Sequence, residues 1–368
     1  MTSNRLEKKL KAKNQSQSRP KIFNLSSKAD RLAMEKLIDR GSVLHTNDDY
    51  QEQLKEFFEV SNPRLVFSPH FNKNWQTELI RLKNKGSLAC QGRWVYFPWS
   101  CSLCHILDEQ KFFTVRTARN RNLITEQEQK NFYEAAIGIA GLSVGNSAAL
   151  AIVLQGGAKR IKLADHDRLA LSNTNRIRTG ITNLGLLKVE MTARQIYEIN
   201  PYAKVDIFPD GLAEKNIGQF CEGLNVIVDE VDNLAVKYLL RQQAKKRKLP
   251  VVMAADNGDG SVVDIERYDL DPKTKFFHGR MGKISYSQLL TLGKRETGRL
   301  ITRHVGEKNI GRAMKSSLGA IGKTIVSWPQ LGGAALISGS AVAYCVRKIL
   351  NKQKIKTNRA IISLEGKL

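Results

Sequence analysis

The chain has few cysteines and no long uninterrupted apolar run. Its 368 residues contain five cysteines, and an odd, sparse number excludes a disulfide-stapled fold. No apolar stretch of about 18 residues is present, so neither a transmembrane helix nor a membrane partner is expected. The nearest candidate, Leu331 to Val346, contains three glycines and two serines. It is predicted to be a buried helix.

The sequence also lacks the apolar segment of a secretory signal near its first residue. Together with the cysteine usage, this predicts a reduced, cytoplasmic protein. A basic transit peptide is the alternative, because residues 1–28 carry eight Lys or Arg and one Glu. Glycine and proline number 27 and 9, which excludes collagen-like and low-complexity chains.

Acidic residues are scarce beside basic ones. The chain has 59 Lys and Arg against 35 Asp and Glu, a formal charge of +24. Such a balance favours an anionic partner, either nucleic acid, an acidic protein or a nucleotide. A soluble basic surface without a dedicated partner is the alternative. The 42% of hydrophobic residues suffices for a core, and the length predicts about two domains.

Composition divides the chain into three parts. Residues 1–29 are predicted to be a basic mobile tail, rich in Lys, Asn, Ser and Gln. Residues 30–115 are predicted to form a smaller accessory module, with helices and a strand at Arg93 to Phe97. Residues 116–368 are predicted to form a nucleotide-binding domain.

Short apolar segments alternate with amphipathic ones after Thr125, which begins a helix in a Thr-Glu-Gln-Glu capping box. Alternating strands and helices predict an α/β fold with a doubly wound, mainly parallel sheet and a Rossmann-like nucleotide-binding core. The predicted strands are Ala136 to Ala140, Arg160 to Ala164, Val205 to Phe208, Leu224 to Val228 and Pro250 to Ala254. The predicted helices are Ser147 to Gln155, Leu186 to Ile199 and Asn233 to Lys246.

A glycine-containing turn separates the first of these strands from its helix. A strand, a glycine loop and a helix N-terminus together bind nucleotide phosphates through backbone N–H groups and the helix dipole. Only Gly141 and Gly145 are present, so the spacing is G-x-x-x-G rather than G-x-G-x-x-G. A tight packing turn is therefore an equal alternative on this motif alone.

A polar cluster follows the second predicted strand. Asp165 lies twenty residues after Gly145, where an acidic side chain can accept hydrogen bonds from ribose hydroxyls. Asx turns in a polar loop are the structural alternative, but they do not account for Arg176. The other members of the cluster are Asp167, Asn173 and Asn175.

Four motifs in register resemble one family. The run 163–176, L-A-D-H-D-R-L-A-L-S-N-T-N-R, resembles the D-x-D-x-V-x-x-S-N-x-x-R signature of ThiF-type, ubiquitin-activating-enzyme-like (MoeB/ThiF) adenylyltransferases. Residues 185–190 resemble the family's G-x-x-K-x-E, 199–201 its I-N-P and 229–233 its D-x-x-D-N. The resemblance is good over about 116–270.

This family activates a carboxylate, usually the C-terminus of a small ubiquitin-like protein, with ATP and Mg²⁺ to form an acyl-adenylate. The resemblance implies that Asp165 holds the ribose and that Asn173, Arg176 and Lys188 contact the phosphates. It also implies that Asp232 holds Mg²⁺. The alternatives are a solvated helix residue for Lys188 and a helix N-cap for Asp232.

The resemblance further implies a homodimer in which an arginine reaches the partner's phosphate site. Arg119, followed by Asn120, best matches this position and would stabilise charge on the transferring phosphorus. A plain surface arginine is the alternative.

The chain departs from thioester-forming members of the family. After Ala254 no cysteine occurs until Cys345, and both Cys345 and Cys221 are predicted to be core residues. Adenylation without a thioester cysteine is therefore expected. Cys90, Cys101, Cys104 and His105 could bind zinc, although half-buried thiols are the favoured interpretation.

Two other functions remain open. The tRNA threonylcarbamoyladenosine dehydratases are similar to this family, and Ser172 to Arg176 with the +24 charge favours them and a tRNA partner. A degenerate, non-catalytic nucleotide-binding protein is favoured by the incomplete glycine loop. The acceptor is otherwise expected to be a small protein or a small-molecule carboxylate.

Overall fold

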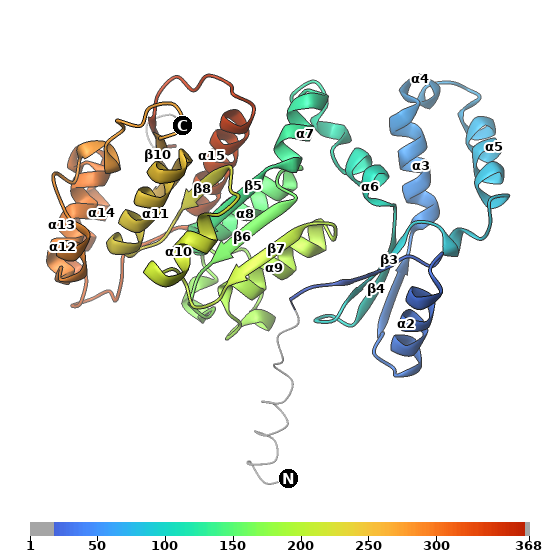
Figure 1. Ribbon diagram of the computed structural model, residues 1–368, viewed down its shortest axis with the longest axis horizontal. Coiled ribbons are helices and arrows are strands. Elements are labelled where there is room, and N and C mark those ends of the chain that lie inside the picture. The colour runs from blue at the N-terminus through green and yellow to red at the C-terminus, as the bar shows by residue number, and fades with distance from the viewer. Residues whose placement is uncertain (1–17, 365–368) are drawn as a thin grey trace, which may run out of the picture. The chain divides into compact units, whose positions relative to one another are not determined.

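The strands form two separate sheets, one in each half of the chain (Figure 1). The computed structural model describes residues 18–364, apart from the side chains of Lys294 and Leu318. The chain divides into two units, Met1–Leu123 and Ile124–Leu368.

The first unit is built on a four-stranded sheet in the order β1-β3-β4-β2. Strand β2 pairs in parallel with β4, and the other two pairings are antiparallel. The strands are β1 (Lys21–Phe23), β2 (His45–Asp48), β3 (Arg93–Phe97) and β4 (Ser102–Ile106). The helices are α2 (Lys28–Asp39), α3 (Tyr50–Ser61), α4 (Pro63–Val66), α5 (Phe71–Lys83) and α6 (Glu109–Arg116).

A buried histidine lies in the first unit. The His105 ring stacks between the rings of Tyr50 and Trp94, with centroid distances of 4.0 and 4.4 Å. Its Nδ1 lies 2.8 Å from Asp48 Oδ1, and its Nε2 lies 2.7 Å from the Gln91 carbonyl oxygen. Both ring nitrogens are thus occupied by structural contacts.

These contacts bear on the zinc alternative. Cys90 is exposed, whereas Cys101 and Cys104 are half-buried free thiols. Within residues 18–364, the side chains of Cys90, Cys101, Cys104 and His105 do not come close enough together to hold one metal ion. Half-buried thiols, the favoured interpretation from sequence, describe this pair.

The predicted tail over residues 1–29 needs correction. Residues 1–17 lie outside the described residues. From Lys21 onward the chain is ordered: β1 pairs with β3, and Phe23 and Leu25 are buried in a cluster with aromatic residues of that strand. Two apolar side chains in a basic segment were enough to add an edge strand.

The first unit also extends past the predicted boundary at residue 115. Helix α6 contacts α3 and the short turn Ala118–Asn120. The Arg121 guanidinium donates to the Val60 carbonyl oxygen over 3.1 Å. These contacts tie the segment up to Leu123 to the first unit.

The second unit contains a seven-stranded sheet in the order β11-β10-β9-β8-β5-β6-β7. The five strands from β9 to β7 are parallel, and β10 and β11 add antiparallel pairings at one edge. The predicted doubly wound, mainly parallel sheet is confirmed. The strands are β5 (Ala136–Ala140), β6 (Arg160–Ala164), β7 (Lys204–Phe208), β8 (Val226–Asp229), β9 (Pro250–Asn257), β10 (Gly260–Arg267) and β11 (Arg359–Ile362).

Helices cover both faces of this sheet. Helices α8 and α9 contact each other, as do α10 and α11, and α15 contacts α8, β9 and β10. The helices are α7 (Glu126–Glu134), α8 (Val144–Leu154), α9 (Lys188–Ile199), α10 (Glu214–Cys221), α11 (Leu234–Arg247), α12 (Tyr286–Leu290), α13 (Lys294–Val305), α14 (Arg312–Ala320) and α15 (Gly332–Leu350). The Thr125 capping box that starts α7 is confirmed.

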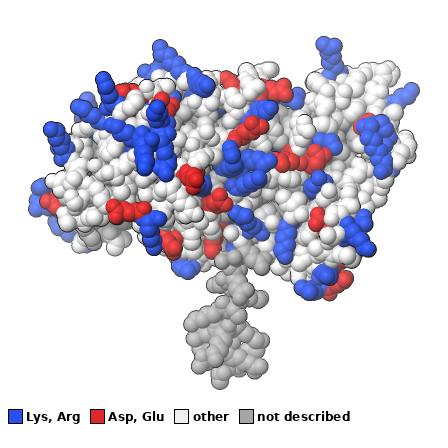
Figure 2. Space-filling model, viewed as in Figure 1, with Lys and Arg blue, Asp and Glu red and all other residues white. Residues whose placement is uncertain are grey.

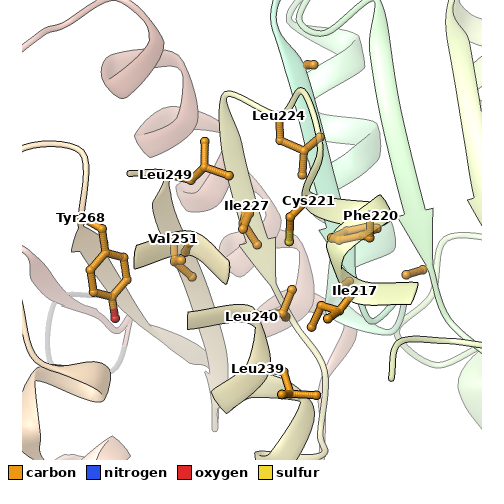
Figure 3. Close-up of a cluster of buried hydrophobic side chains, with 14 residues drawn as sticks. Ile217, Phe220, Cys221, Leu224, Ile227, Leu239, Leu240, Leu249, Val251 and Tyr268 are labelled. Carbon is orange, nitrogen blue, oxygen red and sulfur yellow. The ribbon is translucent and has the colours of Figure 1, made fainter. Parts of the chain in front are cut away.

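Helices α10 and α11 enclose an apolar cluster against the sheet (Figure 3). A Cβ added at Gly138 of β5 would lie 2.4 Å from Leu224 Cδ1 and 2.9 Å from Phe220 Cζ. The missing side chain thus lets the Phe220 ring approach the strand. Each large side chain buried in this way stabilises the fold by about 1.5–3 kcal/mol.

By length and composition, α15 is the one helix among the described residues that could cross a membrane. Half of its apolar window is buried within the protein. A Cβ added at Gly339 would lie 2.6 Å from the Ser147 carbonyl carbon, so α15 packs closely on α8. The helix predicted from Leu331 to Val346 is confirmed as partly buried.

Candidate functional site

Three neighbouring strands of the parallel sheet end at the same level. Ala140 of β5 pairs with Ala164 of β6 on one side and with Asp229 of β8 on the other. The strand order reverses at β5, which is where open α/β sheets bind ligands. The residues that follow these paired ends are Gly141, Asp165 and Glu230.

The first turn requires glycine. Gly141 has φ of +82°, and an added Cβ would lie 2.3 Å from the Glu230 carbonyl oxygen. Its N–H donates to the Ala164 carbonyl oxygen over 2.8 Å. At Gly145 an added Cβ would lie 3.1 Å from Ile139 Cγ2, so this glycine brings α8 close to β5. The turn directs the N-terminus of α8 to the carboxyl edge of the sheet.

Asp165 fixes the glycine loop. Its Oδ2 accepts from the Leu142 N–H over 2.6 Å, and its Oδ1 accepts from the Asp167 N–H over 2.8 Å. The residue is buried, with 8% of its surface exposed. Because each carboxylate oxygen has two lone pairs, Asp165 can still accept from a ribose hydroxyl.

The side chain of Arg176 lies beside the N-terminus of α8. Its Nε donates to Ser143 Oγ over 3.0 Å. Its Nη1 donates to the Asn175 Oδ1 and Ser172 carbonyl oxygens, over 2.9 and 3.2 Å. The helix N-terminus and a guanidinium therefore meet at one point, an arrangement that suits a phosphate.

Asn173 belongs to the same loop as Arg176. Its Oδ1 accepts from the Ala170 N–H over 3.1 Å and closes a short turn. Its side-chain nitrogen, Nδ2, makes no hydrogen bond among the described residues. The side chain therefore shapes the loop through its oxygen and keeps its donor.

Lys188 is the first residue of α9 and is 5% exposed. Its Nζ lies 2.8 Å from Asp167 Oδ2. Burial raises the pKa of Asp167, but the hydrogen bond and the charge of Lys188 outweigh burial and lower it overall. The alternative of a solvated helix residue is wrong for Lys188, because its ammonium group is buried beside this carboxylate.

Asp232 is exposed on the loop between β8 and α11. The helix N-cap is Asn233, whose Oδ1 accepts from the Ala235 and Val236 N–H groups over 2.9 and 3.1 Å. The capping alternative for Asp232 is therefore wrong. Its carboxylate has no hydrogen bond or ion pair within residues 18–364.

The position of Asp232 fits a hard cation. The backbone of Glu230 and Val231 lies directly over Gly141, so Asp232 follows the point where its loop crosses the glycine turn. An exposed carboxylate of this kind is a donor that Mg²⁺ accepts. Asp165, His166 and Asp167 also lie within 4.8 Å of one another, but the Asp167 carboxylate already carries the Lys188 ammonium.

Two further acidic side chains lie near the carboxyl ends of β8 and β9. Glu230 Oε1 accepts from the Ala254 N–H over 2.8 Å. Burial raises the pKa of Glu230 well above its usual range, and nearby acidic groups raise it further. Burial also raises the pKa of Asp256, which accepts from Ser338 Oγ over 2.8 Å. Burial thus favours the neutral forms and limits negative charge at this edge of the sheet.

A buried ion-pair network fixes the end of β8. Asp229 Oδ2 lies 2.5 Å from Arg241 Nη1, and the Nε of this arginine lies 2.7 Å from Glu266 Oε2. Lys237 Nζ lies 3.2 Å from Asp229 Oδ1. The guanidinium carbon lies 4.0 Å from the centre of the Phe277 ring. The network anchors the loop that carries Asp232.

Arg119 belongs to the first unit. It lies in the turn Ala118–Asn120 with an exposed side chain. Its guanidinium makes no hydrogen bond or ion pair in the described part of the chain. The other sequence-predicted site residues all belong to the second unit.

The two candidate core cysteines are buried. Burial raises the pKa of Cys221 to about 12 and that of Cys345 to about 11. Both predictions of core residues are confirmed. A buried, protonated thiol is a poor nucleophile.

Sequence reasoning missed Ser143, Glu230 and Asp256 as members of the site. Ser143 stood in the glycine loop, but no pattern indicated its contact with Arg176. Glu230 was part of the D-x-x-D-N motif without a role of its own. No motif in the sequence contains Asp256. Its position in the site depends on the packing of β9 against α15.

Several known proteins are similar to this chain in sequence. The ThiF family model matches residues 117–365. The uncharacterized protein MT1398 of Mycobacterium tuberculosis (strain CDC 1551 / Oshkosh) is 34% identical over 330 residues, 89% of this chain and 46% of that protein. The tRNA threonylcarbamoyladenosine dehydratase of Escherichia coli (strain K12) is 30% identical over 144 residues, 39% of this chain and 53% of that protein.

A crystal structure of the E. coli dehydratase TcdA aligns with a TM-score of 0.46 at 22% identity, over 64% of this chain and 94% of that one. The chain spans about half the length of the first two relatives. The family model, in contrast, matches well over half of this chain. The chain belongs to the ThiF family.

Proposed function

We propose that this protein is an ATP-dependent adenylyltransferase that converts a carboxylate into an acyl-adenylate. The observation that carries the proposal is the meeting of the Gly141 turn, Asp165 and Arg176 where the strand order reverses. Members of the ThiF family are ATP-dependent adenylyltransferases, which supports this assignment.

The site residues then have distinct roles toward ATP. Asp165 accepts from the ribose hydroxyls. The loop from Gly141 to Gly145 and the start of α8 receive the phosphates, together with Asn173, Arg176 and Lys188. Asp232 would hold Mg²⁺, which would supply positive charge to neutralise the pyrophosphate.

The reaction is an in-line displacement at the α-phosphorus. A carboxylate oxygen of the acceptor forms a bond to phosphorus as the bond to the pyrophosphate oxygen breaks, giving acyl-adenylate and pyrophosphate. Catalysis consists of positioning and charge neutralisation. Arg176 supplies charge from one subunit, and we propose that Arg119 supplies it from the second subunit of a homodimer.

The acceptor is the C-terminus of a small ubiquitin-like protein or a small-molecule carboxylate. Burial of Cys221 and Cys345 supports a reaction that stops at the adenylate without a thioester to either of them. We also propose a reduced, cytoplasmic setting, which suits free cysteines.

A dehydratase acting on tRNA is the second candidate. Two relatives with that name are 30% and 26% identical to this chain. Basic side chains are spread over the face seen in Figure 2. On α13, Arg295, Arg299 and Arg303 are exposed at intervals of four residues. Co-purification of tRNA with the protein would favour this candidate.

Calorimetry with nucleotides tests the proposal without knowledge of the acceptor. ATP with Mg²⁺ should bind, and NAD should bind far more weakly, because Asp232 and Arg176 suit a metal-bound triphosphate. Tight NAD binding without ATP binding would indicate an oxidoreductase. Absence of binding to either nucleotide would contradict the proposal.

A further inference from the structure

We propose that Ser143 and Asn175 are positioning residues that hold the Arg176 guanidinium at the start of α8. The inference rests on the proposed function, because that function assigns Arg176 to the phosphates of ATP. Neither side chain needs to touch the nucleotide. Each acts by fixing the arginine that does.

The hydrogen bonds of Arg176 leave one end of the group unused. A guanidinium carries five N–H groups in a rigid plane. The Nε–H donates to Ser143 Oγ, and the Nη1 hydrogens donate to the Asn175 side chain and the Ser172 carbonyl oxygen. The Nη2 has no partner among the described residues. Its two hydrogens remain for an anionic ligand.

Ser143 is free to serve this purpose. It occupies the N-cap position of α8, yet its side chain makes no capping hydrogen bond to the helix. Its φ and ψ of −79° and −79° are unlike the extended backbone of an ordinary N-cap. The Ser143 hydroxyl instead faces Arg176 from within the glycine loop. A glycine at this position would offer no such acceptor.

Asn175 connects the arginine to a distant segment. Its Oδ1 accepts from Arg176, and its Nδ2 donates to the Gln330 carbonyl oxygen over 2.8 Å. An added Cβ at Gly332 would lie 2.6 Å from the Asn175 carbonyl oxygen, so the start of α15 packs on this residue. The Gln330 amide in turn donates to Asp256 Oδ2 over 3.3 Å. Through Asn175 and Gln330, the Arg176 side chain is thereby connected to Asp256 of β9.

A fixed guanidinium binds better than a mobile one. Arginine loses much rotamer freedom on binding, and a side chain already held in place has less to lose. Charge stabilisation in catalysis likewise depends on donors that are in place before reaction. Ser143 therefore supports ATP affinity through Arg176 alone.

A double-mutant cycle tests this dependence. In calorimetry with ATP and Mg²⁺, Ser143→Ala should weaken binding by about tenfold, the usual effect of a lost hydrogen bond to a charged group. Ser143→Thr keeps a hydroxyl and should recover most of the affinity. In an Arg176→Lys background, which has no Nε–H, Ser143→Ala should have no further effect. Ser316→Ala, an exposed serine on α14, is the matched control.

A second measurement needs no nucleotide. The Nε–H proton of Arg176 should exchange slowly with water in ¹⁵N nuclear magnetic resonance spectra of the ligand-free protein. Exchange should accelerate in Ser143→Ala and stay slow in Ser316→Ala. Asn175→Ala should also weaken ATP binding while leaving the Nε–H protected by Ser143.

The outcomes separate the two proposals. Full additivity of Ser143→Ala with Arg176→Lys, or an Nε–H signal indifferent to Ser143, overturns the positioning role. If the protein binds no ATP while the Nε–H still depends on Ser143, the proposed function fails and the contact stands. If ATP binds and Ser143→Ala changes nothing, only the positioning role fails.

Discussion

Two aspartates illustrate how differently one residue type can be used at the same edge of a sheet. Asp165 is buried, and both of its oxygens accept backbone N–H groups. Asp232 is exposed and has no partner in the described residues. The first shapes the loop, and the second is available to a cation. Their environments, rather than their chemical type, separate the two roles.

We expect Asp232→Ala to abolish the gain in ATP affinity that Mg²⁺ provides. The variant lacks the carboxylate proposed to hold the metal beside the phosphates. Calorimetric titrations with and without Mg²⁺ measure the difference, and acceptor-dependent ATP–pyrophosphate exchange should be lost as well.

Asp259→Ala is the matched control for this experiment, because Asp259 is exposed in the turn between β9 and β10. It should behave as the wild type. Retention of the full Mg²⁺ effect in Asp232→Ala would remove Asp232 from the metal site.

Cys221 should make folding stability depend on alkaline pH. Burial raises its pKa from 9.0 to about 12, so the folded protein keeps a proton that the unfolded chain releases. The contribution is complete below pH 9 and decreases as pH rises toward 12, by about 1.4 kcal/mol per pH unit. Denaturant unfolding of wild type and Cys221→Ala across this range measures it.

The comparison with Cys345→Ala sharpens this measurement. The pKa of Cys345 is raised only to about 11, so its contribution should end one pH unit earlier. Each alanine should cost about 1 kcal/mol in packing at neutral pH and leave ATP–pyrophosphate exchange intact. Loss of exchange in either variant would contradict a purely structural role for that cysteine.

At the scale of elements, the turn at Gly141 is the most constrained segment of the site. Gly141→Ala should destabilise the protein strongly and eliminate ATP binding, because the new Cβ would lie 2.3 Å from a backbone oxygen. Gly185→Ala is the matched control: its φ is also +82°, but nothing lies within 4 Å.

The control isolates backbone strain, which costs about 1–2 kcal/mol for a left-handed residue. The excess loss in Gly141→Ala then measures the clash. Unfolding in urea and calorimetry with ATP provide the two readouts. Equal losses in both variants would mean that the close approach to Glu230 is not rigid.

The sequence predicted the five parallel strands because each is a short, largely apolar segment and three predicted helices lie between them. It placed the start of α8 at Ser147, whereas the helix begins at Val144. Propensity favours a later start, but the N-terminus at Val144 is set by the Gly141 turn. The local pattern does not contain that contact.

Strand β10 was not predicted, since Asp264 and Glu266 interrupt its apolar pattern. Both are buried. Arg280 and Arg359 lie 2.8 and 2.9 Å from Asp264, and Arg241 lies 2.7 Å from Glu266. The strand can form because arginines from other segments neutralise these two carboxylates. The sequence around β10 does not show that these arginines lie beside it.

The residues of the candidate site also differ in whether the sequence alone could identify them. Asp165, Arg176 and Lys188 were found because each lies in a motif with fixed spacing. The contact between Ser143 and Arg176 joins residues 33 positions apart, and only the folded chain brings them together. Motifs identified the groups that face the ligand, and packing determined the residues that hold them.

At the scale of the whole molecule, the two units assign different residues to the proposed reaction. Arg119 lies in the first unit, and the glycine turn, Asp165 and Asp232 lie in the second. Its proposed role across a dimer therefore concerns assembly. Sedimentation at micromolar concentration should show a dimer if that role is correct.

Mixing two inactive variants tests the role of Arg119 in trans. Arg119→Ala and Asp232→Ala should each lose ATP–pyrophosphate exchange with a working acceptor. Mixed dimers would contain one site with both residues intact, so an equal mixture should recover about a quarter of the wild-type activity.

Arg121→Ala serves as the comparison for Arg119→Ala, because Arg121 is already engaged with Val60 and should not be needed in trans. No recovery on mixing, together with a monomer in sedimentation, would exclude the second subunit's arginine from the site.

The buried trio of Asp229, Arg241 and Glu266 limits how this sequence can evolve. Loss of the arginine alone would leave two buried carboxylates without a cation. Removing one partner of a buried ion pair lowers the free energy of unfolding by about 3–5 kcal/mol. Replacing all members by apolar residues of similar volume is often neutral. Variants in which only one or two of the three residues have been replaced should therefore be unstable. Descendants of this protein should therefore exchange the three positions together, and an alignment of such descendants should show them covarying.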